Sequence, residues 1–348
     1  MKRLLLALPL LVPLPAAAQE AEPPTPASVV AGAAPSEWVA IAPEDLLVMD
    51  LAPDARGRAR RVVIQLMPAP FSQPWVENIR RLAAAHWWDG TQVYRVVDNW
   101  VAQWGAGEDG GEAGFAEHPL PEEVVSPVAD YEAKLPQSTS PAADWEAVAK
   151  EIVRRNAEQD TPTGYISNVL VTVENTPPSF ADPYAEIAKF RDGWPIAQNY
   201  DPAELAWPVH CYGSVGVARD LAPDTGTGAE LYAVIGHAPR QLDRNIAVVG
   251  RVIEGIEHLS TLPRGTADAG VYATRAEDTP IVSVRLGNEM PDPPAFEYLG
   301  TESESFARYV QVRANRNDAF YQVPAGGVDV CNVQVPIRRV ASPGRVGR

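Results

Sequence analysis

Two polar side chains, Arg95 and Gln103, interrupt a run of strand-forming residues and are the first candidates for chemistry. They lie in YRVVDNWVAQWG, residues 94–105, whose β-formers are Tyr94, Val96, Val97, Trp100 and Val101. A guanidinium keeps its charge at any working pH and donates hydrogen bonds without accepting any. If this run lies in a core, the core must accommodate a permanent charge. The alternative is a surface strand cation held in an ion pair.

The usual motifs of nucleophilic, metal and phosphate chemistry are missing. The sequence holds no G-x-S-x-G, H-E-x-x-H, P-loop or EF-hand loop, and Gly226 and Gly228 are only a fragment of a dinucleotide fingerprint. The five histidines lie apart, at positions 86, 118, 210, 237 and 258, and none pairs at metal-ligand spacing. Structural roles are favoured for them, and we expect neither a metal nor a cofactor.

Compact segments on both sides of residues 106–207 must position Arg95. Residues 46–66 are two apolar runs around a turn, which predicts a β-hairpin. A helix is predicted next, over about 72–86. Ser72 is the predicted N-cap of this helix, and Trp75, Ile79 and Leu82 form its predicted apolar face. Four strand-like runs lie within 209–290, with a short helix over about 253–262 between the last two.

The segment 106–207 has a different character. It opens with an acidic, glycine-rich loop, and residues 140–160 predict an amphipathic helix. The stripe expected to pack this helix on the rest of the chain contains Trp145, Val148 and Ile152. Residues 169–173 predict a short strand, and the remainder, with Trp194 and Trp207 among prolines, reads as ordered loop.

The last segment, 291–348, predicts an α+β tail. Thr301 and Glu304 have the spacing of a capping box before a helix that carries Phe306 and Tyr309. The strand-like run VDVCNVQVPI follows, near the end of the chain. Residues 19–44, rich in proline, alanine and glutamate at their start, predict a flexible lead before the first hairpin.

The length and composition of the chain limit the classes of protein to which it can belong. A chain of 348 residues with 46% hydrophobic residues can build a sizeable core, and 34 prolines with 25 glycines favour a turn-rich β protein. The formal net charge of −16 argues against a nucleic-acid partner. The two cysteines, Cys211 and Cys331, form one disulfide in an oxidising compartment or remain two buried thiols.

The N-terminus predicts export. Lys2 and Arg3 precede an apolar run over residues 4–14, and three alanines at 16–18 follow. This is the pattern of a secretory signal peptide over residues 1–18. The alternative, a membrane anchor, is disfavoured because the apolar run is short and interrupted by prolines. The mature protein is therefore expected in the periplasm or secreted, without membrane insertion.

The order of the blocks resembles the cyclophilin-type peptidyl-prolyl isomerases. The family helix E-N-F-R-x-L is matched by residues 77–82, and Y-D-G-T-x-F-H-R is matched by residues 88–95. G-S-Q-F-F-I aligns with residues 228–233, and L-D-G-x-x-x-V-F-G aligns with residues 242–250. The resemblance covers roughly 45–105 and 209–290, and almost every block is altered.

The resemblance implies a mainly β fold, an eight-stranded antiparallel barrel closed by two helices. The cyclophilin-like domain would span residues 45–290, with barrel parts 45–105 and 209–290. Residues 106–208 would be an irregular or helical insertion in place of a shorter loop. Residues 291–348 would be an extension that packs on the barrel.

The resemblance also implies roles for single residues. Arg95 matches the catalytic arginine, and Gln103 matches the glutamine that positions it and the substrate carbonyl. The substrate-binding residues would be Trp100, Val101, Ala218, Arg219, Glu230, Tyr232, Leu242 and Ile246. Among these, Trp100, Tyr232 and Leu242 have a simpler alternative as core residues.

Several positions depart from the family pattern. Glu230 replaces a glutamine and adds charge beside the peptide path, and Ile246 replaces a histidine or tyrosine. Trp100, in Asp98-Asn99-Trp100 where the family has Pro-Gly-Phe, narrows the proline pocket. The implied function is isomerisation of X-Pro bonds in exported proteins, with proline-containing peptides as partners. The alternative is a peptide-binding module with weak or no catalysis.

Overall fold

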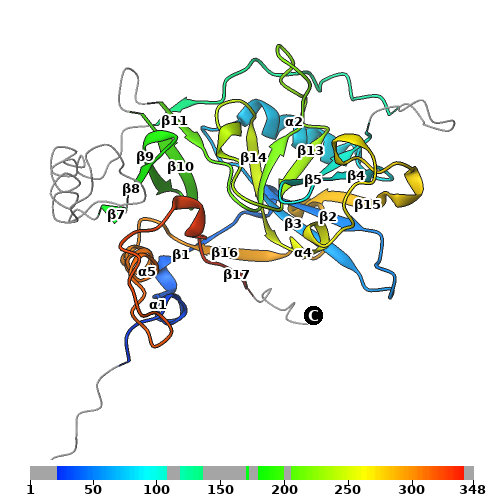
Figure 1. Ribbon diagram of the computed structural model, residues 1–348. Coiled ribbons are helices and arrows are strands. Elements are labelled where there is room, and N and C mark those ends of the chain that lie inside the picture. The colour runs from blue at the N-terminus through cyan, green and yellow to red at the C-terminus, as the bar shows by residue number, and fades with distance from the viewer. Residues whose placement is uncertain (1–21, 108–117, 136–169, 172–178, 200–204, 341–348) are drawn as a thin grey trace, which may run out of the picture.

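The strand-like runs on either side of residues 106–207 join in one closed barrel. A computed structural model describes residues 22–107, 118–135, 170–171, 179–199 and 205–340. The barrel order is β12-β13-β5-β4-β15-β2-β3-β14, and all eight pairings are antiparallel (Figure 1). The predicted eight-stranded antiparallel barrel is confirmed. Its strands are β2 (Leu46–Leu51), β3 (Arg60–Leu66), β4 (Gln92–Val96), β5 (Val101–Gly105), β12 (Ser214–Val217), β13 (Leu231–Val234), β14 (Val248–Glu254) and β15 (Thr279–Leu286).

The first hairpin, β2 and β3, forms where the apolar runs predict it. The side chains of Met49 and Ile64 fill the barrel interior, whereas Val48 and Val63 face outward. The outward pair is also buried, because Phe296 of strand β16 (Ala295–Leu299) packs on it. Burial on both faces explains why these strands are continuously apolar rather than alternating.

Two helices close the barrel, and one is shorter than predicted. Helix α2 (Gln73–Ala84) buries its predicted face in the barrel core. Ser72 takes the N-cap position, but its φ of 54° is left-handed and its hydroxyl makes no capping hydrogen bond. Helix α4 (Glu257–Ser260) covers four residues instead of the predicted 253–262, because strand β14 continues to Glu254.

The described residues of the insertion form a six-stranded β-sheet, which corrects the prediction of irregular structure there, whereas the predicted helix over 140–160 lies outside the described residues. Its described strands pair in the order β6-β11-β10-β9-β8-β7. They are β6 (Ala133–Lys134), β7 (Leu170–Val171), β8 (Ser179–Asp182), β9 (Ala185–Arg191), β10 (Trp194–Gln198) and β11 (Leu205–Pro208). The predicted stripe Trp145, Val148 and Ile152 lies outside the described residues.

Trp194 and Trp207 therefore lie in strands, not in the predicted loop. The turn between β9 and β10 is Asp192-Gly193, and both residues have positive φ, 48° and 82°. Asp-Gly between two apolar runs is a strong hairpin signal, because it fits the turn whose twist matches that of the strands. Proline at the second position of β10 masked this signal in the sequence.

A second core joins the N-terminal segment, the insertion and the tail. Phe190 and Trp207 of the insertion pack with Val29, Trp38 and Phe306. In Figure 1 this part lies to the left of the barrel. Its remaining elements are α1 (Pro26–Ala31), β1 (Trp38–Ala40), α5 (Glu304–Ala314) and β17 (Ile337–Val340).

The expected flexible lead over 19–44 is corrected within residues 22–44. Helix α1 contacts α5, and strand β1 pairs with β16 in the three-stranded sheet β1-β16-β17. The predicted capping box is also wrong, because Ser303 caps α5 and accepts the N–H of Phe306. Thr301 is buried and instead accepts the N–H of Gly193 at the β9–β10 turn.

A disulfide and the side chain of Arg251 are among the contacts that join this second part to the barrel. Cys211 and Cys331 form a disulfide with a Cα–Cα distance of 5.1 Å, which decides between the two alternatives for the cysteines. Cys331 lies in a short 3-10 turn at 330–332, so the strand predicted there begins only at Ile337. The guanidinium of Arg251 donates to Gln65 and to the carbonyl of Gly193, and it stacks on Trp194.

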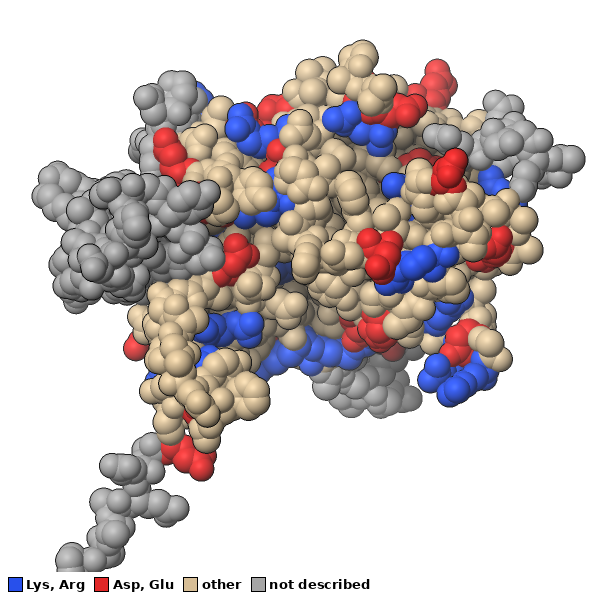
Figure 2. All heavy atoms as spheres, in the orientation of Figure 1, with Lys and Arg blue, Asp and Glu red and all other residues tan. Residues whose placement is uncertain are grey.

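Charge is mixed on the described surface. Figure 2 shows blue and red side chains interspersed across the face that it draws, without a broad basic area among the residues coloured there. Within the described ranges, no helix has the length and apolar character to cross a membrane.

Candidate active site

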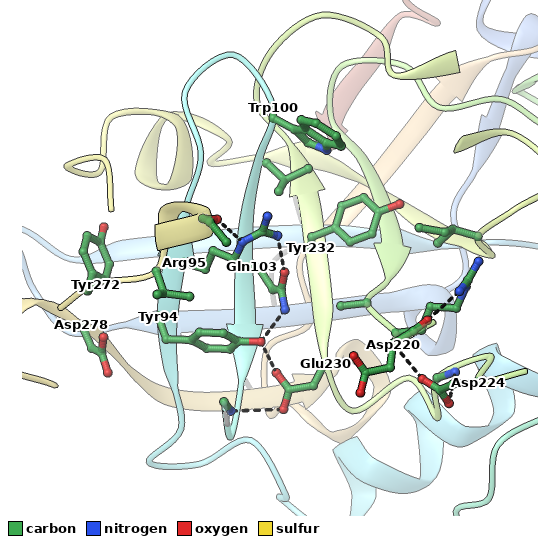
Figure 3. A pocket seen from close by; sticks show the side chains of 18 of the residues that line it. Tyr94, Arg95, Trp100, Gln103, Asp220, Asp224, Glu230, Tyr232, Tyr272 and Asp278 are labelled. Carbon is green, nitrogen blue, oxygen red and sulfur yellow. Dashed lines mark hydrogen bonds between the residues drawn. The ribbon is translucent and has the colours of Figure 1, made fainter. Parts of the chain in front are cut away.

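All ten site residues that the resemblance implies line one cavity of about 800 Å³. The cavity lies on the outside of the barrel, over β4, β5 and β13 (Figure 3). The ten residues are Arg95, Trp100, Val101, Gln103, Ala218, Arg219, Glu230, Tyr232, Leu242 and Ile246. The structure thus brings together residues that are up to 151 positions apart in the chain.

The run 94–105 is a hairpin rather than a single strand. Strands β4 and β5 pair with a register shift between Val93 and Arg95, so Tyr94 is an extra residue on β4. In regular strands neighbouring side chains point to opposite faces, but a bulge turns one of them. Tyr94 and Arg95 both line the cavity for this reason.

Two oxygens hold the guanidinium of Arg95. Its Nη1 donates to Oε1 of Gln103 at 2.8 Å, and its Nε donates to the carbonyl of Ala269 at 2.7 Å. The side chain is half-buried, and no carboxylate among the described residues forms an ion pair with it. The surface ion-pair alternative is therefore wrong, and the cation faces the cavity without a neutralising charge.

A hydrogen-bond chain continues from Gln103 to the far end of the cavity. Nε2 of Gln103 donates to the hydroxyl of Tyr94, and this hydroxyl donates to Oε2 of Glu230 at 2.9 Å (Figure 3). Oε1 of Glu230 accepts the backbone N–H of Ala106 at 2.8 Å. Burial, followed by the negative charge of Glu230, raises the pKa of Tyr94. The Tyr94 hydroxyl therefore keeps its proton throughout the physiological range.

The other end of the cavity is apolar. Val101 and Tyr232 are buried, and the half-buried Ala218, Leu242 and Ile246 pack on them. Trp100 stands at this end with 41% of its side chain exposed, so its alternative as a core residue is wrong. The result is a small apolar slot beside a guanidinium (Figure 3).

A buried polar network fixes the back of this slot. The Tyr232 hydroxyl lies 3.0 Å from Nε2 of His210, and Nδ1 of His210 lies 2.9 Å from Oδ1 of Asp243. Because a carboxylate paired with Arg240 only accepts, Nδ1 of His210 carries a proton and donates it to Asp243. Oδ2 of Asp243 accepts from Nε of Arg240, which also pairs with Asp182 of the insertion. The structural role predicted for histidine is confirmed at His210.

The loop that follows β12 contributes both backbone and charge. The N–H of Ala218 is already bonded to the carbonyl of Glu230, at 2.9 Å, and is therefore not free for a peptide. The Arg219 guanidinium turns along the wall to the carbonyls of Asn245 and Asp220. Asp220 and Asp224 line the cavity close to Glu230 (Figure 3).

Sequence reasoning missed two contributors to the site. Tyr94 lies in the matched block 88–95, where the family pattern has a histidine. The sequence therefore located Tyr94 beside Arg95, but it did not indicate a role for it in the site. The segment 265–272 pairs with β4, where the N–H of Tyr272 donates to the carbonyl of Tyr94. Its Ala269 has a φ of 56°, a strained conformation that no sequence signal announces. Within the described part of the chain, no three His, Cys, Asp or Glu residues lie close enough to hold a metal.

Comparison with known families agrees with this geometry. A family model described as cyclophilin type peptidyl-prolyl cis-trans isomerase/CLD matches residues 57–286, well over half of the chain. The chain belongs to this family. The resemblance inferred from the altered blocks is confirmed.

One solved structure shows the same fold. The crystal structure of the cyclophilin AquaCyp293 from Hirschia baltica aligns with a TM-score of 0.57 at 19% identity, over 92% of this chain and 99% of that one. A Cryptosporidium parvum cyclophilin type peptidyl-prolyl cis-trans isomerase, solved in the presence of the dipeptide Ala-Pro, aligns with a TM-score of 0.33 at 10% identity, over 69% of this chain and 98% of that one. No curated protein matches the sequence at a significant level.

The family membership fixes the class of reaction. Cyclophilin-type isomerases bind proline-containing peptides and interconvert the cis and trans forms of the X-Pro bond, and this cyclophilin is an enzyme of that class. The predicted fold and the predicted enzyme class are both confirmed. The roles of the single residues in the cavity remain predictions.

Proposed function

We propose that this cyclophilin isomerises X-Pro bonds of exported proteins, with Arg95 as its catalytic residue. One observation carries the assignment of the site. An arginine held by two oxygens, without an ion-pair partner among the described residues, faces a cavity whose neighbouring end is an apolar slot. This combination matches the needs of amide rotation.

The reaction needs no nucleophile and no proton transfer. Rotation about a peptide bond has a barrier of ~18–20 kcal/mol because it breaks the double-bond character of C–N. As the bond twists, the prolyl nitrogen becomes pyramidal and gains a lone pair. A guanidinium that donates to this nitrogen binds the twisted amide better than the planar one, and such differential binding lowers the barrier. Arg95 is the donor available in the cavity.

The apolar slot would hold the proline ring. Val101, Leu242 and Ile246 present hydrocarbon, and the ring of Tyr232 closes the back while its hydroxyl points to His210. Trp100 at the rim would cover the bound ring from solvent. Gln103, fixed to Arg95, would position both the guanidinium and the substrate carbonyl.

The proposal that the protein is exported depends on features of its sequence. The cations at positions 2 and 3, the apolar run over 4–14 and the alanines at 16–18 predict a signal peptide. A disulfide between Cys211 and Cys331 suits an oxidising compartment such as the periplasm. Unfolded exported proteins, whose X-Pro bonds isomerise slowly, would then be the substrates.

A second candidate function is peptide binding with weak catalysis. The carboxylate of Glu230 and the bulk of Trp100 alter the groove relative to the family pattern, and Ile246 replaces a polar border residue. All three changes alter the surface that a bound peptide would meet. They favour slow turnover of a tightly held peptide.

A protease-coupled assay distinguishes the two functions. Protein that begins at residue 19 is incubated with a proline tetrapeptide, and the cis-to-trans rate is compared with that of the Arg95→Ala variant and with buffer. Acceleration by wild type that is lost in the variant supports the isomerase. No acceleration by folded wild type, together with saturable peptide binding, supports the binding module.

A further inference from the structure

The hydrogen-bond chain behind Arg95 has a defined direction. Oε1 of Gln103 accepts from Arg95, so the amide nitrogen of Gln103 points to the hydroxyl of Tyr94. The same hydroxyl lies 2.9 Å from the carboxylate of Glu230. The chain runs from a pure donor, the guanidinium, to a pure acceptor, the carboxylate, through two groups that can do both.

The single proton of Tyr94 supports the same orientation of the amide that Arg95 requires. A hydroxyl has one proton to donate and can accept from others. When it donates to Glu230, it can only accept from Gln103, so the NH₂ of Gln103 must face Tyr94. The oxygen of Gln103 is then left facing Arg95. Burial and the charge of Glu230 raise the pKa of Tyr94, so the proton stays on the hydroxyl.

The carboxylate of Glu230 is itself held in place. Its Oε1 accepts the backbone N–H groups of Ala106 and Gly107, at 2.8 Å and 3.3 Å. The approach requires glycine at position 105, because a Cβ there would collide with the carboxylate. The two backbone N–H groups, and the space that glycine leaves at position 105, therefore hold the carboxylate of Glu230 in place. This carboxylate, which can only accept, ends the series of hydrogen bonds.

Loss of this acceptor would release the amide. Without Glu230, the hydroxyl of Tyr94 is free to donate to Oε1 of Gln103. The amide can then turn by 180° and place its NH₂ against the guanidinium of Arg95. Two donors facing each other cannot bond, so the guanidinium would lose one of its two anchors and leave the reactive position.

We propose that Glu230 is a positioning residue that acts through Tyr94 to fix the amide of Gln103, and thereby the guanidinium of Arg95. This deepens the proposed function and rests on it. The family pattern has glutamine and histidine at these two positions, so the carboxylate and the phenol depart from that pattern at both. Neither residue needs to touch the reacting bond.

Three variants and a matched control test the proposal. Tyr94→Phe removes the relay, Glu230→Ala removes the acceptor, and Glu230→Gln keeps an oxygen that can still accept from Tyr94. Tyr309→Phe is the control, because the hydroxyl of the buried Tyr309 also donates a hydrogen bond, to the carbonyl of Gln334, but lies in the second core. Thermal unfolding of each protein confirms that it is folded.

We expect a loss of turnover rather than of affinity. The kcat should fall about tenfold in Tyr94→Phe and Glu230→Ala, which corresponds to one hydrogen bond to a charged group. In Glu230→Gln the kcat should fall by less than in these two variants. In all three variants KM should stay within twofold of the wild-type value. The double variant Tyr94→Phe/Glu230→Ala should be no worse than either single variant, because both act through one chain. Tyr309→Phe should match wild type.

The orientation of Gln103 can be read without activity. The side-chain amide resonances of Gln103 in a ¹⁵N–¹H spectrum, assigned by their loss in Gln103→Leu, should shift in Tyr94→Phe and Glu230→Ala but not in Tyr309→Phe. Unchanged resonances in both variants, or additive losses of kcat in the double variant, would overturn the proposal. If folded wild type shows no isomerase activity, the proposed function fails, and the spectrum still decides whether the lock exists.

Discussion

Arg95 and Gln103 are direct cross-strand partners on β4 and β5, and their side chains bond at 2.8 Å. Side chains opposite each other in an antiparallel pair lie on the same face and within reach. The orientation of the guanidinium is therefore built into the sheet, where a rigid backbone fixes both ends. A loop would hold the same pair less firmly.

Replacement of Arg95 should lower turnover with little change in affinity. If Arg95 donates to the prolyl nitrogen mainly in the transition state, Arg95→Ala should reduce kcat by about a hundredfold or more and leave KM within about threefold. Arg95→Lys should rescue poorly, because an ammonium lacks the fork that bonds Gln103 and the carbonyl of Ala269 together. Protease-coupled kinetics over a range of peptide concentrations separates kcat from KM.

A different result would reassign the catalytic residue. Full activity in Arg95→Ala, with a circular dichroism spectrum like that of wild type, would contradict this mechanism. Arg338→Ala provides the control, because Arg338 lies on β17 in the second part, away from the cavity, and pairs with Glu297. It should retain wild-type kcat.

Trp100 should act on binding instead. Its side chain is 41% exposed in the free protein, so a bound proline would cover apolar surface there. Trp100→Ala should raise KM about five- to tenfold with a smaller change in kcat, because the apolar contact exists in both the ground state and the transition state. Trp100→Phe should stay within about twofold of wild type. An unchanged KM in Trp100→Ala would place the proline ring elsewhere.

The barrel was predictable because local and distant signals agreed. The turn between β2 and β3, the apolar face of α2 and the ordered blocks around Arg95 all specify the same fold. The site residues could be located for the same reason, since they lie within the blocks that match the family pattern or in the segments that flank those blocks. In this half of the chain, the turn signals, the apolar patterns and the order of the blocks rarely disagreed about the fold.

The second part was predicted only for its tail helix, because its core depends on contacts between distant segments. Val29, Phe190 and Phe306 come from three regions of the sequence and bury one another. The apolar face of α5 was readable, and the helix that carries Phe306 and Tyr309 was predicted. The lead and the insertion gave weaker signals, apart from the Asp192-Gly193 turn, so composition favoured a flexible lead and an irregular insertion.

The details of the site were hidden for a different reason. The bulge at Tyr94 and the positive φ of Ala269 are backbone departures that tertiary contacts impose. They decide that Tyr94 joins Arg95 in the cavity and that a carbonyl meets its Nε. The secondary-structure propensities of these residues would assign both positions to ordinary strand or loop.

Stability should fall in acid partly through Asp89. The hydrogen bond from Arg285 first, and then the N–H of Val284, lower the pKa of Asp89, and Arg285 reaches both of its oxygens at 2.7 Å. A carboxyl group whose pKa is lowered on folding stabilises above its unfolded pKa of about 3.9, and this stabilisation is lost as the pH falls through the folded value. Both side chains stay partly exposed, so we expect about 1 kcal/mol.

Urea unfolding at pH 7 and at pH 3 tests this contribution. Asp89→Asn should lower the free energy of unfolding by about 1 kcal/mol at pH 7, and the difference from wild type should shrink towards pH 3. Asp292→Asn is the control, because Asp292 is exposed and in no ion pair among the described residues. An equal difference at both pH values would assign the effect to packing rather than to charge.

Reduction of the disulfide should weaken the fold and spare the site. Cys211 and Cys331 are 120 positions apart, so the bond closes a long loop in the unfolded chain. In the chain-entropy model such a loop contributes up to about 5 kcal/mol. Dithiothreitol should therefore lower the urea midpoint of wild type and leave that of Cys211→Ser/Cys331→Ser unchanged. Equal midpoints for wild type with and without reductant would contradict the contribution to stability.

The activity of the folded protein should survive that reduction. Every residue that lines the site cavity lies between Tyr94 and Asp278, so none belongs to the tail that Cys331 fastens. His210, next to Cys211, is held independently, because Asp243 accepts both its backbone N–H and its Nδ1–H at 2.9 Å. We therefore expect kcat and KM of reduced, folded protein within about twofold of the oxidised values at 25 °C. A rise in KM on reduction, with the midpoint still far above the assay conditions, would instead mean that the tail holds the slot through His210 and Tyr232.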